Sequence, residues 1–226
     1  MKDLRDLKDL ENKKVLLRLD LNVPLKKGVI KDETRINKIL PILKLLLKLN
    51  LKIIIVSHIG RPKGKIDPEL SLKPICENLE KKIKHKIYFL TEDIREIKDK
   101  NLFKNFKENI LILENIRFYS EEENNDLNFA KHLGSFADIY VNDAFSCSHR
   151  AHASVANITK FLPSYAGLQM NSEVKALKKV TKDIEKPITC IIGGSKISTK
   201  IGIIENLITK FDNIIFVGGM ANNILS

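Results

Sequence analysis

The side chains of this sequence that are best suited to chemistry stand just after its short apolar runs. They are Asp20, Asn22, His58, Arg61, Arg117 and Arg150, and Arg35 joins them at the start of an amphipathic stretch. Arginine binds carboxylate and phosphate through paired hydrogen bonds, and a cluster of cations repels itself unless an anion lies among them. Together these residues predict a site for a small, multiply charged anion.

Taken singly, the same residues have ordinary interpretations. Asp20 and Asn22 are common types in turns and caps, and Arg61 and Arg117 are typical of surface ion pairs. The sequence alone leaves both interpretations open.

Metal binding is a rival interpretation for a short segment that contains Cys147, His149 and His152. A structural zinc site needs a fourth ligand, which the sequence does not offer. We therefore expect no metal site, and we expect His152 to pack inside a loop.

A glycine-rich turn, Gly193 to Lys200, follows an apolar run and opens a helical pattern. Its backbone N–H groups and the helix dipole would point toward a phosphate, and Lys196 and Lys200 share one helix face. The turn lacks the spacing of a Walker A loop. Its sequence is compatible with a phosphate site and does not require one.

Seven runs rich in Val, Ile and Leu must position these residues, and they predict buried parallel strands. The runs are Val15 to Leu19, Ile53 to Val56, Ile87 to Leu90, Ile110 to Leu113, Ile139 to Val141, Ile188 to Ile192 and Ile214 to Val217. An apolar stripe from Ile36 to Leu47 predicts a helix that Pro41 kinks. This order predicts an α/β fold with a doubly wound, Rossmann-like parallel sheet, whose ligands bind beyond the carboxyl ends of the strands.

We expect the chain to contain one domain and the start of another. The predicted limits are 1–167 for an N-terminal domain, 168–186 for an inter-domain helix and hinge, and 187–226 for an incomplete second α/β domain. Only two predicted strands follow the hinge, which is too few to close a second core.

The composition narrows the function classes. A formal net charge of +11 attracts polyanions, but the lysines are scattered rather than gathered with aromatics, which argues against nucleic-acid binding. The charged N-terminus lacks a signal-peptide pattern, and three distant cysteines are typical of free thiols. We expect a cytoplasmic protein that neither binds nor crosses a membrane.

Five ordered motifs resemble the signatures of phosphoglycerate kinase, and the similarity extends from Lys13 to Met220. The motifs are Arg18 to Pro24, Asp32 to Ile36, Ser57 to Gly64, Leu113 to Phe118 and Tyr140 to Ser154. The resemblance implies reversible transfer of the ATP γ-phosphoryl group to the carboxylate of 3-phospho-D-glycerate, a step of glycolysis that gives 1,3-bisphosphoglycerate and ADP. It also implies a monomer with a closing hinge.

The resemblance implies a role for each acceptor-side residue. Asp20 and Asn22 would bind the glycerate hydroxyl and carboxylate, and Arg35 would face the moving phosphoryl group. Four side chains would hold the 3-phosphate: His58, Arg61, Arg117 and Arg150. Arg18 and His149 would complete the basic patch.

On the donor side, the resemblance implies binding of ATP or ADP with Mg²⁺. Lys196 would steady the transferred phosphoryl group, and Arg35 and Lys196 would be the catalytic residues. The nucleotide would contact Gly194, Lys196, Lys200, Gly218 and Gly219. Because a carboxylate acceptor is already ionised, the reaction needs no general base. The family's later nucleotide-binding segments have no counterpart here, so we expect a fragment that binds 3-phosphoglycerate without full activity.

Overall fold

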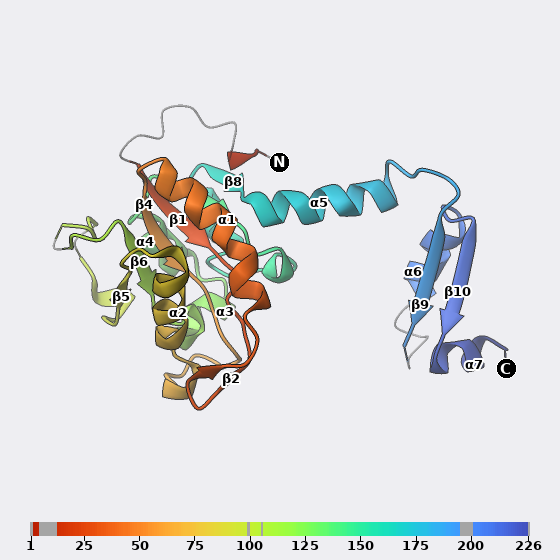
Figure 1. Ribbon diagram of the computed structural model, residues 1–226, viewed down its shortest axis with the longest axis horizontal. Helices are drawn as coiled ribbons and strands as arrows, with labels where there is room; N and C mark the ends of the chain where they lie inside the picture. The colour runs from red at the N-terminus through yellow and green to blue at the C-terminus, as the bar shows by residue number, and fades with distance from the viewer. Residues whose placement is uncertain (1, 5–12, 99, 105, 195–200, 226) are drawn as a thin grey trace. The chain divides into compact units, whose positions relative to one another are not determined.

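The computed structural model describes residues 2–4, 13–98, 100–104, 106–194 and 201–225 of the chain. It divides into two compact units, Met1–Ser172 and Glu173–Ser226. Figure 1 shows the strands and helices of each unit.

The first unit is built on a six-stranded parallel sheet with the order β5-β6-β4-β1-β7-β8. Its strands are β1 (Lys14–Arg18), β4 (Lys52–Val56), β5 (Tyr88–Leu90), β6 (Ile110–Leu113), β7 (Ile139–Asn142) and β8 (Ser164–Ala166). The five strands predicted for this region are confirmed, as is the α/β fold. The sequence analysis missed β8, because three residues that include a serine form no apolar run.

Helices cover both faces of this sheet (Figure 1). Its longer helices are α1 (Thr34–Lys48), α2 (Lys73–Ile83) and α4 (Leu127–Gly134). Because successive strand residues point to opposite faces, Leu17 packs in the cluster that includes α1 and α2, whereas Leu16 packs in the cluster that includes α4. The predicted apolar stripe of α1 is buried at four positions and partly buried at Leu40 and Leu47, and the helix continues through Pro41.

Short elements complete the first unit. They are the hairpin strands β2 (Leu25–Lys26) and β3 (Val29–Ile30), helix α3 (Ser120–Glu123), and the 3-10 helices η2 (Pro68–Leu70), η3 (Ile94–Glu96), η4 (Ile116–Phe118), η5 (Phe145–Cys147) and η6 (Asn157–Lys160). Of these, η4 follows β6 and η5 follows β7, so both lie near the carboxyl edge of the sheet. This edge is where the sequence places its charged residues.

The second unit contains one parallel strand pair, β9 (Thr189–Gly193) and β10 (Asn213–Val217), as predicted. Its helices are α6 (Ile201–Ile208) and α7 (Gly219–Leu225), and α5 (Leu168–Thr181) spans the division between the units. Several apolar side chains of β9, β10 and α6 are exposed. Among the described residues, no helix has the length and apolar character needed to cross a membrane.

Candidate functional site

The carboxyl ends of β1, β4, β6 and β7 meet at one edge of the sheet, because these strands are parallel neighbours. A cavity of about 210 Å³ lies there, which we call the anion cavity. Its lining residues are Asn22, Arg35, His58, Gly60, Arg61, Arg117, Ser146, Cys147, His149 and Arg150. The lining thus contains every predicted acceptor-side residue except Asp20 and Arg18. Asp20 contacts the lining residues Arg35 and Ser146.

Asp20 and Asn22 organise the rim of the anion cavity. The Asp20 carboxylate accepts hydrogen bonds from Arg35 Nη1, from Ser146 Oγ at 2.5 Å and from the Asn22 backbone N–H at 3.1 Å. The Asn22 side-chain oxygen accepts from the Gly60 N–H at 2.9 Å. The turn interpretation therefore holds for Asp20. The Asn22 side chain instead connects its loop to Gly60, and it lines the cavity.

Arg117 is the most deeply buried cation of the cavity lining, with 3% of its side chain exposed. It stands on η4, where its N–H donates to the buried Asn115 side chain at 3.2 Å. Its Nη1 donates to Gly60 O at 3.1 Å, while its Nε lies 3.6 Å from Glu123 Oε1 and has no hydrogen-bond partner. Burial lowers the pKa of Arg117, yet an arginine stays charged at neutral pH.

Burial, followed by the charges of Arg18 and Arg117, lowers the pKa of His58 to about 2. His58 is therefore a neutral donor rather than a cation. The predicted mutual repulsion of this cluster was wrong in this respect, and Asp20 and Glu123 also supply compensating charge. The cavity can still hold an anion. Repulsion between its cations requires an anion less strongly than the sequence suggested, because His58 is neutral and two carboxylates offset part of the charge.

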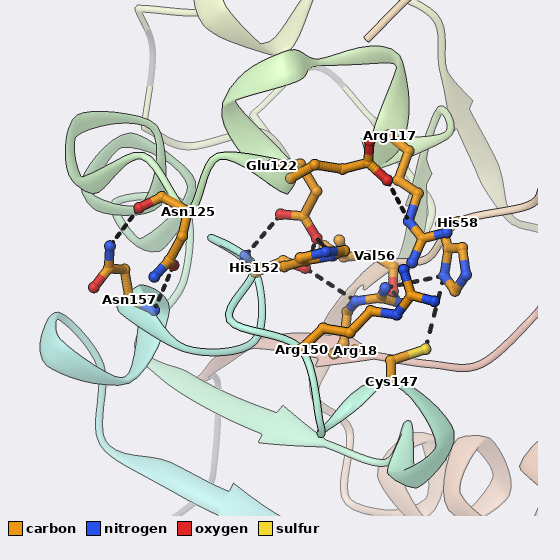
Figure 2. A network of polar contacts seen from close by, with 12 residues as sticks. Arg18, Val56, His58, Arg117, Glu122, Asn125, Cys147, Arg150, His152 and Asn157 are labelled. Carbon is orange, nitrogen blue, oxygen red and sulfur yellow. Dashed lines mark hydrogen bonds and ion pairs between the residues drawn. The ribbon is translucent and has the colours of Figure 1, made fainter. Parts of the chain in front are cut away.

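A buried polar network lies behind the anion cavity (Figure 2). Arg18 and Glu122 are both fully buried, and Ser154 connects them: Arg18 Nε donates to Ser154 Oγ at 3.0 Å, which donates to Glu122 Oε1 at 2.6 Å. Arg18 is absent from the cavity lining, although the resemblance placed it in the basic patch. The sequence analysis missed Glu122, because it stands in a run of three glutamates that is typical of an exposed helix start.

The mouth of the cavity is more exposed. Arg61 and His149 are exposed, and Arg150 is half-buried and donates through Nε to His149 Nε2 at 3.3 Å. These side chains are free to adjust to a ligand, whereas Arg117 and His58 are held in place.

His152 does not line the anion cavity. It is buried with Nδ1 3.7 Å from Glu122 Oε1, and burial lowers its pKa to about 4. In the part of the chain that the structure describes, no three or more His, Cys, Asp or Glu residues are grouped to hold a metal ion, so Cys147, His149 and His152 do not assemble into such a site.

The predicted nucleotide residues lie in the second unit, where Lys196 and Lys200 fall outside the described residues. Gly194 and Gly218 follow the paired strands β9 and β10, so they lie at the same edge of this small sheet. Their φ values of 145° and 64° lie in the region that favours glycine. A Cβ on Gly219 would come 4.0 Å from Gly194 O, which places the two turns side by side.

A larger cavity, of about 470 Å³, lies at the C-terminal end of α2. Its lining mixes the carboxylates of Glu77 and Glu80 with Lys81, Lys84, His85 and Lys86. It contains no arginine, and its cations stand beside acids. The smaller cavity has the better chemistry for a multiply charged anion.

Similarity to known proteins extends over nearly the whole chain. A sequence profile described as phosphoglycerate kinase matches residues 4–226. The phosphoglycerate kinase of Wolbachia sp. subsp. Drosophila simulans is 50% identical over 218 residues, which cover 96% of this chain and 54% of the relative. That of Dictyoglomus turgidum is 48% identical over 219 residues, with the same two coverages of 96% and 54%.

Solved structures give the same result. The phosphoglycerate kinase from Coxiella burnetii matches with a TM-score of 0.88 at 36% identity, over 99% of this chain and 56% of that one. The crystal structure of the enzyme from Pyrococcus horikoshii OT3 matches with a TM-score of 0.83 at 28% identity, over 98% and 56%. The chain spans about half the length of the curated relatives that it matches. It belongs to the phosphoglycerate kinase family.

Proposed function

We propose that the anion cavity binds 3-phosphoglycerate as the phosphoryl acceptor of the phosphoglycerate kinase reaction. The main support is Arg117, a nearly buried guanidinium that lines the cavity together with Arg61 and Arg150. A phosphate oxygen is the natural acceptor for such a donor. His58, Arg61 and Arg150 would complete the phosphate site, while Asp20 and Asn22 would bind the glycerate end.

The reaction that we propose for the whole protein is reversible transfer of the ATP γ-phosphoryl group to the acceptor carboxylate. Arg35 lines the cavity from α1, forms an ion pair with Asp20 and is more exposed than Arg117. It would stabilise charge on the moving phosphoryl group together with Lys196. Mg²⁺ bound with the nucleotide would neutralise phosphate charge, and Gly194, Lys200, Gly218 and Gly219 would hold the nucleotide.

We also propose the roles of the three parts of the chain, its location and its oligomeric state. Residues 1–167 would bind the acceptor, 168–186 would form the hinge, and 187–226 would begin the nucleotide-binding domain. A cytoplasmic location fits Cys76, Cys147 and Cys190, which are free thiols. We propose a monomer that works in glycolysis on small-molecule substrates rather than on nucleic acid or membranes.

The test is calorimetric titration of the 226-residue chain with 3-phosphoglycerate. Mg-ATP is titrated in parallel, and glycerate serves as the ligand that lacks the phosphate. We expect saturable binding of 3-phosphoglycerate, and we expect Arg117→Ala to weaken it at least about a hundredfold, because a charge-assisted contact in a buried site is lost.

Arg95→Ala is the matched control. Arg95 is a half-exposed arginine of the same unit that pairs with Asp93 and Glu121 and does not line the anion cavity. It should leave the affinity unchanged. Equal losses in the two variants, or binding of DNA that falls steeply with salt and ignores Arg117, would contradict the proposal and favour non-specific electrostatics.

A further inference from the structure

Arg18 connects the anion cavity to a carboxylate that the cavity does not touch. Its side chain is fully buried, and its guanidinium donates in several directions. Nε donates to Ser154 Oγ at 3.0 Å, Nη1 to Leu19 O at 2.6 Å, and Nη2 lies 3.1 Å from His58 Nδ1. Figure 2 shows Arg18 together with His58 and Glu122 in this network.

The hydrogen bonds on the Glu122 side have a defined direction. Ser154 Oγ accepts from Arg18, so its single hydrogen is available for Glu122 Oε1, 2.6 Å away. The Ser154 N–H donates to Glu122 Oε2 at 2.8 Å, so both oxygens accept, as a carboxylate does. Burial raises the pKa of Glu122, and the charge of Arg18 opposes that rise. Tyr140 fixes Ser154 further by donating to its carbonyl at 2.7 Å.

The direction on the His58 side follows from the chemistry of arginine. A guanidinium has no acceptor, so His58 Nδ1 must accept from Arg18 Nη2. The sulfur of Cys147 lies 3.9 Å from the same nitrogen. A neutral imidazole whose Nδ1 accepts carries its hydrogen on Nε2.

We propose that Glu122, Ser154 and Arg18 are positioning residues that hold His58 as a neutral Nε2–H donor to the anion in the cavity. Glu122 compensates the buried charge of Arg18, and Ser154 orients the guanidinium so that its far end meets Nδ1. The identity of the anion as 3-phosphoglycerate rests on the proposed function. The position of the hydrogen on the His58 ring does not depend on it.

The first test needs no ligand. Long-range ¹H–¹⁵N correlation spectra of the full chain report which ring nitrogen of each histidine carries a hydrogen, and His58→Gln assigns the His58 signals. We expect a single neutral form with hydrogen on Nε2 at pH 7. A His58 signal with hydrogen on Nδ1, or with both nitrogens protonated, would overturn the proposal even if 3-phosphoglycerate binds.

The second test removes the Ser154 hydroxyl, which connects Arg18 to Glu122. Ser154→Ala should allow a second His58 form to appear and should weaken 3-phosphoglycerate binding by about tenfold. Ser135→Ala is the matched control, because Ser135 bonds within its own helix end, to His132 O. An unchanged His58 spectrum in a folded Ser154→Ala variant would overturn the proposal.

Two further variants test the proposal in case Ser154→Ala does not fold. Glu122→Gln removes the charge and keeps the size, with the neighbouring Glu121→Gln as its control, and Arg18→Lys keeps a charge without the branched donor. Both Glu122→Gln and Arg18→Lys should perturb the His58 form, and Glu121→Gln should not. If the His58 changes occur but 3-phosphoglycerate never binds, the positioning role stands and the proposed function fails.

Discussion

Strands of similar composition are buried to very different extents in the two units. Ile54 in β4 is 0% exposed, whereas Ile191 in β9 is 67% exposed and Ile215 in β10 is 47% exposed. The first unit covers its sheet with α1 and α2 on one face and α4 on the other, while the sheet in the described part of the second unit consists of β9 and β10. A short run rich in Val, Ile and Leu therefore predicts a strand, but the layers packed against that strand decide how much its burial stabilises the fold.

The described parts of the two units also differ in whether they bury charged side chains. The first unit holds Arg18 and Glu122 at 0% exposure, because a covered sheet edge fixes their partners on several elements at once. Gly194 and Gly218 of the second unit, which the sequence predicted to contact the nucleotide, have positive φ values and carry no side-chain charge.

The largest expected difference is in the free energy of unfolding when an isoleucine of each unit is replaced by alanine. Ile54→Ala should lower the free energy of unfolding by about 2–5 kcal/mol, because it leaves a cavity in a packed core. Ile191→Ala should change it by less than about 0.5 kcal/mol, because its side chain is mostly in water. Urea unfolding followed by circular dichroism measures both, and similar losses would break the comparison.

A second comparison uses pH. Burial raises the pKa of Asp143 to about 6, whereas the Ile188 N–H and Lys186 lower the pKa of Asp212. Between about pH 6 and 4 the folded state takes up a proton at Asp143 that the unfolded state does not, so this group makes the protein more stable as pH falls. The contribution of Asp212 has the opposite sign and is lost as pH falls through its folded pKa.

Asparagine variants test this difference in sign. The free energy of unfolding of Asp143→Asn, relative to the native sequence, should be higher at pH 8 than at pH 4 by about 2–3 kcal/mol. Asp212→Asn should be the less stable of the two variants at pH 8 and should approach the native sequence in acid. Parallel pH profiles for the two variants would contradict the assignment of Asp143 as a buried carboxylate.

Glycines give the smallest contrast. A methyl group at Gly167 would clash with the Asp143 carboxylate, so Gly167→Ala should destabilise the first unit by about 1–3 kcal/mol. Gly202, in α6, has nothing within 4 Å of an added Cβ, and Gly202→Ala should stabilise that helix by up to about 1 kcal/mol. Thermal unfolding measures both, and a shift of the same sign would contradict the difference in packing.

Most strands and the main helix of the fold could be predicted from the sequence. Its seven apolar runs are strands, and the stripe from Ile36 to Leu47 is the buried face of α1. It could not reveal β8, whose pairing with β7 depends on tertiary contacts rather than on an apolar pattern. Residue types at strand ends also predicted which side chains gather at the anion cavity.

The sequence could not show how these side chains are held. Nothing in the run from Glu121 to Glu123 distinguishes the fully buried Glu122 from its neighbours, because its partner Ser154 is 32 residues away. Nor did the count of basic residues show that His58 is neutral, since its pKa depends on burial among arginines. Charge state is a property of the folded site.

The most direct test of the account is chemical-shift mapping of the ¹⁵N-labelled chain during titration with 3-phosphoglycerate. We predict saturable shifts confined to the first unit and centred on the backbone amides of Asn22, Gly60 and Cys147, which surround the anion cavity. Shifts centred on Lys81 and Lys84 at the larger cavity, or on β9 and β10, would contradict the central claim that the arginine-lined edge of the six-stranded sheet is the acceptor site.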